Sequence, residues 1–206
     1  MSEDRFLGRP GASDSAIQLR IELAAFELFE QSGFEHATAG DIAAAAKVTE
    51  QEFHAQFETL VDTVLVVQQE LLRRAADHLA SLPTWEFSLF VIESTVVDVL
   101  TTLESDLFAA SERLLRLRSL LITDGPFRAA VAAHILTQTN PFEVWATNQP
   151  TASSEDKLKN WLTFEIASAT VRAAFDTWAA ESAGGSERTL LEVYRHACAL
   201  ARLVVD

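Results

Sequence analysis

The 206-residue sequence contains little cysteine, glycine or proline: one Cys, seven Gly and five Pro. A single cysteine, Cys198, excludes an internal disulfide and fits the reducing environment of the cytosol. Alanine, leucine and glutamate are common instead, and this balance favours helix over sheet. The one Asp-Gly pair, at 124–125, is followed by Pro126 and separates helical patterns rather than strands. The composition therefore predicts an all-α fold.

Long apolar runs are absent as well. No run approaches the ~18 residues that a membrane-spanning helix requires. The first residues, Met1-Ser2-Glu3-Asp4, are acidic where a signal peptide would be basic. We therefore expect a soluble, cytoplasmic protein without a membrane partner.

Positive charge is scarce: 16 Lys and Arg stand against 30 Asp and Glu, a net charge of −14 at pH 7. Residues 1–60 hold four cations and eleven acids, a net charge of −7. The remaining twelve cations and nineteen acids give another −7, so the deficit is spread over both parts of the chain. Because Lys and Arg supply most non-specific affinity for DNA phosphates, this balance argues against strong DNA binding.

Enzyme signatures are missing too. The sequence has no G-x-S-x-G, no H-E-x-x-H and no phosphate-binding Gly loop, and its five His are scattered. Cys198 is expected to be a small buried apolar residue rather than a nucleophile. We expect no catalytic activity, no cofactor and no metal site.

Residues 20–63 combine a helical apolar stripe with three helix-capping signals. The stripe consists of Ile21, Ala24, Ala25, Leu28 and Phe29. Gly33 ends that helix, since glycine adopts a positive φ without steric cost. The capping pairs, each a threonine with an acid three residues later, are Thr38 with Asp41, Thr49 with Glu52, and Thr59 with Asp62. Two short helices joined at residues 46–49 predict a helix-turn-helix.

This stretch resembles the N-terminal DNA-binding domain of TetR-like transcriptional regulators, because the elements follow that family's order and spacing. The matching residues are Ala24-Ala25, Leu28-Phe29, Gly33-Phe34, Thr38, Asp41-Ile42-Ala43, Val48 and Phe57. The resemblance covers roughly the first 65 residues in detail, and beyond them it depends on length and helical character. It implies a dimer with a DNA-binding head and a ligand-binding helical body.

The domain organisation follows from the helical pattern. About nine helices are expected, at about 14–32, 39–46, 50–56, 60–82, 85–103, 106–122, 126–138, 155–182 and 187–204. Thr84 is a candidate cap for the fifth of these, and Ser186 or Glu187 for the last. We expect a flexible arm at 1–12, a helix-turn-helix domain at 13–60, and a ligand-binding and dimerisation domain at 61–206.

The resemblance implies DNA contacts from the second and third helices, through Thr38, Lys47, Thr49, Gln51, His54 and Gln56. The sequence departs from the family pattern at several positions: Lys47 stands where Gly is usual, Gln51-Glu52 replace Gly-Thr, His54 and Gln56 replace aromatic residues, and Leu60 replaces a Lys. Glu50, Glu52 and Glu58 would lie near phosphates, where each exposed like-charge contact costs about 1 kcal/mol or less. Alternatively, Glu52 serves only as a capping acid.

Aromatic residues concentrate in the second part of the chain, where all four Trp lie beyond residue 83. Such residues can line a cavity for a small apolar or aromatic ligand, or simply form core. The candidate ligand-binding residues are Trp85, Phe90, Arg113, Arg116, Phe127, Phe142, Trp145, Trp161 and Phe164. Arg113 and Arg116 share a helix face and could hold a carboxylate or phosphate, or could pair with acids on a solvated face.

The last two predicted helices are apolar on more than one face. Two such hairpins can bury the surplus surface across a two-fold axis as a four-helix interface, which the family resemblance also implies. The candidate interface residues are Leu158, Trp161, Leu162, Val193, Ala197 and Leu200. Arg172 and Asp176, four residues apart, are expected to pair at this interface.

Two functions are compatible with these features. The first is a TetR-like homodimeric regulator, such as a repressor, whose binding to operator DNA is controlled by a small hydrophobic ligand. The second is a ligand-sensing or partner-binding protein that kept this fold but lost direct DNA binding because its head is acidic.

Overall fold

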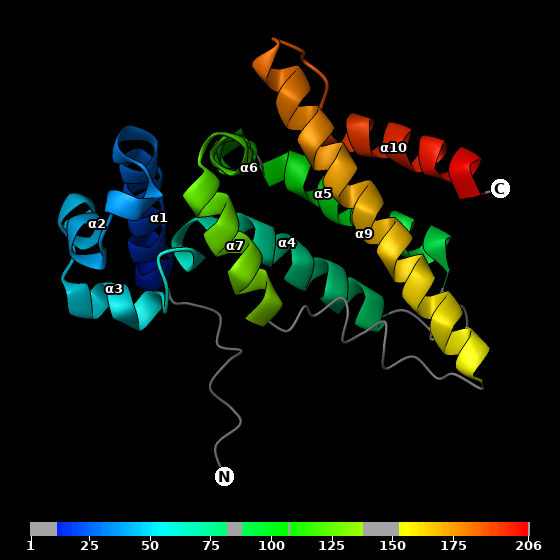
Figure 1. The fold of residues 1–206 in the computed structure, drawn as a ribbon, viewed down its shortest axis with the longest axis horizontal. Coiled ribbons are helices and arrows are strands. Elements are labelled where there is room, and N and C mark those ends of the chain that lie inside the picture. The colour runs from blue at the N-terminus through cyan, green and yellow to red at the C-terminus, as the bar shows by residue number, and fades with distance from the viewer. Residues whose placement is uncertain (1–11, 82–87, 107, 138–152, 206) are drawn as a thin grey trace. The chain divides into compact units, whose positions relative to one another are not determined.

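The computed structural model describes residues 12–81, 88–106, 108–137 and 153–205, and within them every regular element is a helix. The elements are α1 (Ala12–Ser32), the 3₁₀ helix η1 (Phe34–His36), α2 (Ala39–Ala46), α3 (Glu50–Gln56), α4 (Asp62–Ser81), α5 (Leu89–Asp106), α6 (Phe108–Thr123), α7 (Gly125–Thr137), α9 (Ser154–Ala183) and α10 (Leu190–Val205) (Figure 1). The predicted all-α class is confirmed. The expected arm and the cap at Thr84 lie outside the described residues or at their edge.

The chain divides into two compact units. The first contains Met1–Val66 and Leu120–Val131, and the second contains Val67–Ser119 and Ala132–Asp206. Three helices, α4, α6 and α7, therefore contribute residues to both units. The sequence predicted a simple boundary after residue 60. It did not predict that residues 120–131 pack with the N-terminal segment.

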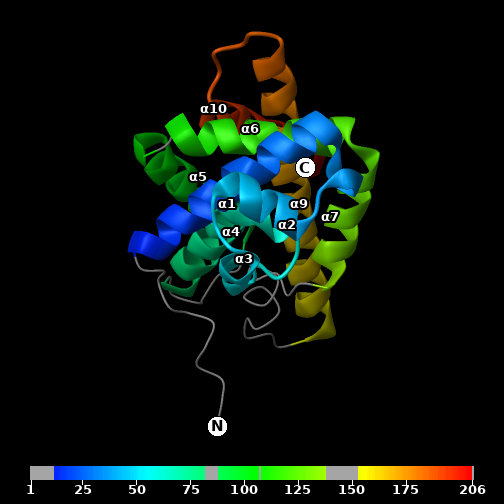
Figure 2. The same cartoon turned by 90° about the vertical axis from the view of Figure 1, so that its left-hand side faces the viewer.

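The core of the first unit forms where α2 and α3 pack beside α1 (Figure 2). Its fully buried large apolar side chains are Ile21, Phe26, Phe29, Ile42, Phe53 and Phe127. Short helices such as α2 and α3 are marginal alone, so most of their stability comes from this packing. The buried residues recur at helical spacing, which is why the sequence pattern located these helices well.

Side-chain caps define where these helices begin. The amide of Asp41 donates to Thr38 Oγ1 over 3.2 Å, and the Thr38 amide donates back to Asp41 Oδ2 over 3.1 Å. The same reciprocal bonds join Thr49 with Glu52 before α3, and Thr59 with Asp62 before α4. All three predicted capping pairs are present, including the two with a shorter aspartate arm.

The start of α10 differs from its prediction. The Thr189 amide donates to Glu192 Oε2 over 2.9 Å, and the Glu192 amide donates to Thr189 Oγ1 over 3.2 Å. The helix consequently begins at Leu190 rather than near Ser186 or Glu187. Thr189 is the cap because Glu192 follows it by three residues, the spacing that a capping box requires.

The second unit is built around α9, a 30-residue helix, with α5 and α10 packed against it. Its start is capped by Ser153 and Asp156. The largest buried side chains of this core include Leu79, Ile92, Leu114, Phe164, Phe175, Trp178 and Tyr194. Most of the aromatic residues that the structure describes in this unit are therefore core, the simpler of the two interpretations of the pattern.

One residue of the head has an unfavourable backbone conformation. Lys47, at the end of α2, has φ 56° and ψ 47°, and is the one non-glycine residue with positive φ in the described part of the chain. Its amide donates to the Ala43 and Ala44 carbonyls, so the left-handed turn ends α2 and starts the connection to α3. A side chain in this region costs about 1–2 kcal/mol, part of which glycine avoids.

We predict that Lys47→Gly raises the free energy of unfolding by up to about 1 kcal/mol, because the relief of strain exceeds the extra entropy of an unfolded glycine. Chemical denaturation followed by circular dichroism measures the change. The matched control is Ala45→Gly, an exposed position inside α2, which should lower stability by about 1 kcal/mol. A lower stability for Lys47→Gly would contradict the argument.

Candidate functional site

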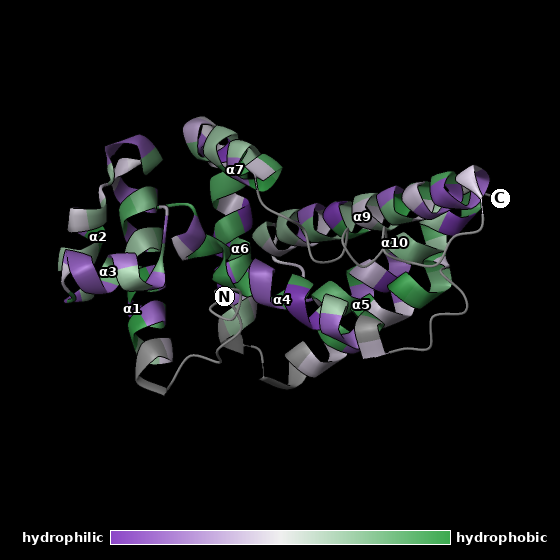
Figure 3. Ribbon diagram, turned by 90° about the horizontal axis from the view of Figure 1, so that it is seen from below, coloured by the Kyte–Doolittle hydropathy of each residue, from purple (hydrophilic) through white to green (hydrophobic). Residues whose placement is uncertain are grey.

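The turn between α2 and α3 has the geometry of a helix-turn-helix. The left-handed Lys47 reverses the chain, and the Val48 amide donates to the Ala43 carbonyl over 2.9 Å. Phe53 and Phe57, whose ring centroids lie 6.0 Å apart, anchor α3 to the core of the unit. The opposite side of α3 is left to solvent, and Figure 3 shows this helix as largely hydrophilic.

The predicted DNA-contacting residues all lie at the surface of the head. Gln51 and His54 are exposed and, three residues apart on α3, share a face. Gln56 is half-buried, and Lys47 is exposed at the turn. These four side chains could reach a base edge or a phosphate.

The two threonines are differently placed. The Thr38 hydroxyl donates to Asp41 Oδ2 over 2.6 Å, and the Thr49 hydroxyl donates to Glu52 Oε2 over 2.9 Å. Each hydroxyl also accepts from the amide of its capping acid. Their hydrogen atoms are therefore engaged in the caps, and neither hydroxyl is free to donate to a phosphate.

Carboxylates occupy the helix ends at which a phosphate would bind. Asp41 closes the N-terminus of α2 and Glu52 that of α3. Hydrogen bonds from the Thr49 amide and hydroxyl lower the pKa of Glu52, so this carboxylate is ionised at neutral pH. A Cβ atom on Gly40 would collide with Glu50 Oε1, which places the Glu50 carboxylate against the first turn of α2. Both positive helix ends are thus neutralised from within the chain.

A link between residues 29–34 and 124–127 was not predicted from the sequence. Asp124 Oδ2 accepts from the Phe34 amide over 2.9 Å, and Oδ1 accepts from the Phe127 amide over 2.8 Å. The Phe127 ring lies 5.9 Å from Phe29 and 5.5 Å from Phe34. Phe127, a candidate ligand residue, is thus buried in the core of the first unit. Asp124 before Gly-Pro signalled a helix start, but its second partner is 90 residues away.

The remaining candidate ligand residues are dispersed. Trp85, Phe142 and Trp145 lie outside the described residues. Phe90 is 69% exposed on α5, whereas Phe164 is buried on α9 with Trp161 beside it, at a centroid distance of 6.1 Å. Arg113 and Arg116 are half-buried on α6 and have partners. Among the described members of this set, the structure places Trp161 beside Phe164 and shows no cavity that they share with Phe90.

Arg118, also on α6, was not among the predicted ligand residues, and its side chain is 13% exposed. Its Nη1 lies 3.3 Å from Asp176 Oδ1, and its guanidinium carbon lies 5.0 Å from the centre of the Phe175 ring. Burial lowers the pKa of Arg118, and the nearby Asp176 partly offsets that shift. Asp176 had been expected to pair with Arg172. The fold brings Arg118 to it instead, across 58 residues.

The predicted dimer residues fall into two groups. Leu158, Leu162 and Leu200 are about half exposed and Trp161 is 42% exposed. Val193 is 2% exposed within its own chain, and Ala197 is partly covered by the same core. The exposed members could meet a partner, but Val193 already packs inside the second unit.

The described segments hold neither a cluster of metal-ligating side chains nor a membrane-spanning helix. Nowhere in these segments do three or more His, Cys, Asp or Glu side chains gather closely enough to hold a metal ion. None of the described helices is both long and apolar enough to cross a membrane.

Comparison with known proteins supports the architecture. No family model matches this sequence, and no curated protein matches it. Among solved structures, the fold is similar to that of a TetR-family transcriptional repressor. That repressor is FadR from Thermus thermophilus, in complex with lauroyl-CoA. The two structures align with a TM-score of 0.50 and 22% sequence identity, over 89% of the present chain and 92% of the FadR chain. The two proteins share a fold over nearly their whole length.

We predict that Asp124→Ala lowers the stability of the first unit by about 1–2 kcal/mol, because two amides lose their acceptor. Amide hydrogen exchange should show faster exchange at Phe34 in particular. Asp156→Ala is a matched control that removes a capping carboxylate from α9 in the second unit. If the Phe34 amide exchanges equally fast in both variants, the hydrogen bond to Asp124 does not specifically stabilise this part of the first unit.

Proposed function

We propose that this protein is a TetR-like transcriptional regulator that binds operator DNA as a homodimer and responds to a small apolar or aromatic ligand. The observation that carries the proposal is the geometry of α2 and α3, two short capped helices joined by the left-handed turn at Lys47. Gln51 and His54 stand on the exposed face of the second helix. A fold shared with a repressor that binds lauroyl-CoA supports the same assignment.

The ligand would act through the helices that belong to both units. A ligand bound in the second unit would shift α6, whose last residues belong to the first unit. There, Asp124 and Phe127 would pass the shift to Phe34, the first residue of η1. Such control requires that the ligand binds one arrangement of the heads more tightly than another. Lauroyl-CoA, the ligand of the structural neighbour, is a suitable first probe.

A second candidate function has its own supporting observation. Asp41, Glu50 and Glu52 lie at the N-termini of α2 and α3, and Arg20 and Lys47 are the only Lys or Arg among residues 12–66. A phosphate approaching these helix ends would meet carboxylates rather than free amides. The protein would then act by binding a ligand or a partner protein, without contacting DNA.

Binding to the DNA upstream of the protein's own gene, measured at low and moderate salt, separates the two functions. The first function predicts binding with a shallow dependence on salt, because Arg20 and Lys47 would release only about two counterions per chain. The second predicts no binding by the wild type at low salt. It also predicts that the triple variant Glu50→Lys, Glu52→Gln and Leu60→Lys binds, because Gln retains the capping geometry while charge is restored.

The matched control for that variant is Glu27→Lys with Glu35→Lys, which raises the net charge by the same amount at exposed positions on α1 and η1. If this control binds DNA as tightly as the triple variant does, the net charge of the protein determines DNA affinity, and the position of the carboxylates at the helix ends does not. If neither variant nor the wild type binds, the DNA-binding assignment of the head is wrong.

The homodimer would form through the exposed apolar residues of α9 and α10. We predict that Leu162→Glu with Leu200→Glu weakens association at least about a hundredfold, because each change buries an unpaired carboxylate in the interface. Sedimentation equilibrium at micromolar concentration measures the effect. Ile122→Glu, at a 61% exposed position on α6, is the control and should not change association. A double variant that remains dimeric would place the interface elsewhere.

A further inference from the structure

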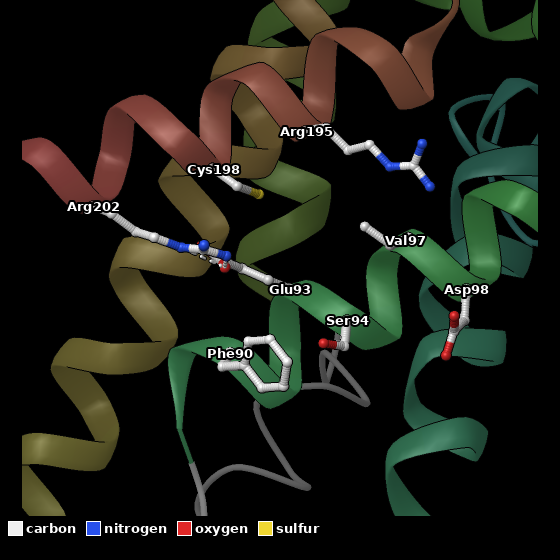
Figure 4. A pocket seen from close by; sticks show the side chains of 8 residues that line it. All are labelled: Phe90, Glu93, Ser94, Val97, Asp98, Arg195, Cys198 and Arg202. Carbon is white, nitrogen blue, oxygen red and sulfur yellow. Dashed lines mark hydrogen bonds and ion pairs between the residues drawn. The ribbon is translucent and has the colours of Figure 1, made fainter.

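A pocket of about 280 Å³ lies in the second unit, where α5 packs against α10. It is lined by Phe90, Glu93, Ser94, Val97, Asp98, Arg195, Cys198 and Arg202 (Figure 4). Its size is at the lower end of small-molecule sites and suits a ligand about as large as an amino acid. None of its residues except Phe90 was among the predicted ligand contacts.

The most informative residue in the pocket is Glu93. Its side chain is 4% exposed, and its Oε2 atom pairs with Arg202, which donates from Nε over 3.2 Å and also from Nη2. The other carboxylate oxygen, Oε1, is buried and accepts no hydrogen bond from any residue that the structure describes. A buried acceptor without a donor is costly, so such an atom in a pocket indicates a place for a ligand donor.

Neighbouring side chains meet this need only weakly. The Tyr194 hydroxyl is itself buried without a hydrogen-bond partner among the described residues, so the two groups do not satisfy each other. Burial, the nearby Glu93 carboxylate and a hydrogen bond between this thiol and Glu93 raise the pKa of Cys198 to about 11, although Tyr194 and Arg202 oppose the shift. A neutral thiol is only a weak donor. The pocket therefore holds a buried carboxylate oxygen with unused bonding capacity.

The rest of the lining defines what else a ligand would meet. Phe90 is 69% exposed and Val97 is half-buried, so both offer apolar surface to an aromatic or aliphatic group. Asp98, 3.4 Å from His78 through Oδ2 and Nε2, and Arg195 are exposed and lie at the rim. Figure 4 shows Arg195 extending from α10 on the side of the pocket away from Arg202.

These features favour a cationic donor over an anion. An anion beside Glu93 would face a buried carboxylate oxygen that has no proton to share, and repulsion would be strong at such a site. An ammonium group offers three N–H donors and a charge that complements the carboxylate. Arg202 already neutralises one oxygen of Glu93, so the ammonium would bind the second.

We propose that this pocket binds a small molecule that joins a primary ammonium group to an apolar or aromatic body, with the ammonium donating to Glu93 Oε1. The body lies on Phe90 and Val97. Two sources share this chemistry, a free amine and an α-amino acid, and Arg195 distinguishes them because only the amino acid has a carboxylate for it. The inference is independent of whether the head binds DNA.

Isothermal titration calorimetry on the full-length protein, without DNA, tests the proposal with three probes of one shape. Phenethylamine and L-phenylalanine carry the ammonium, and 3-phenylpropionate carries only a carboxylate. At least one ammonium probe should bind at least tenfold more tightly than 3-phenylpropionate. Arg195→Met should weaken the binding of L-phenylalanine and leave the binding of phenethylamine unchanged. That result would identify the ligand as an α-amino acid rather than a free amine.

Three variants link the binding to this pocket. Glu93→Gln should weaken the binding of the ammonium probe at least tenfold, because the glutamine amide lacks the negative charge of the carboxylate. Val97→Trp fills the pocket without altering Glu93, so it should abolish binding even if Glu93→Gln fails to fold. Leu203→Ala, at a 76% exposed position on α10 outside the pocket lining, should have no effect. Circular dichroism establishes that each variant is folded.

Three outcomes would overturn the proposal. The first is the absence of saturable binding by either ammonium probe at millimolar concentration. The second is equal binding by 3-phenylpropionate, which would make the two arginines, and not Glu93, the recognition element. The third is undiminished binding in Val97→Trp, which would place the ligand elsewhere in the chain.

Discussion

A hydroxyl followed three residues later by a carboxylate is the interaction on which most helix starts in this protein depend. It closes α2, α3, α4, α9 and α10, through the pairs that begin at Thr38, Thr49, Thr59, Ser153 and Thr189. Each pair satisfies amides that the helix itself leaves without acceptors, which stabilises a helix end by about 1 kcal/mol. The short helices α2 and α3 depend on it most, because they have few backbone bonds of their own.

The same interaction limits what the head can bind. A helix N-terminus attracts phosphate because of its free amides and its partial positive charge. In α2 and α3 the capping carboxylate offsets the partial positive charge and the cap engages two of the amides, and Glu50 adds a second negative charge beside Gly40. If the protein binds DNA as proposed, the capping that stabilises the helix-turn-helix works against phosphate binding at these helix ends. Exposed side chains such as Gln51 and His54 would then carry more of the contact.

The buried charges of the second unit are satisfied to different degrees. Arg118 pairs with Asp176 through Nη1 and lies against the face of Phe175, but its buried Nε has no hydrogen-bond partner among the described residues. Glu93 has a partner for one oxygen only. A buried group with unused capacity is expensive to maintain, which is why such groups mark binding sites more often than well-paired ones do.

The sequence by itself determined the helical class, the three caps at Thr38, Thr49 and Thr59, and the bounds of most helices within a few residues. These features depend on residues three or four positions apart, so local spacing reveals them. Contacts between distant residues were decided only by the tertiary structure. Asp124 meets the Phe34 amide, Arg118 rather than Arg172 meets Asp176, and Arg202 meets Glu93 across 109 residues. Phe127 and Phe164 became core, and Val193 was buried in its own chain, because packing selects which apolar faces are covered. Spacing along one helix cannot show which other helix will lie against it.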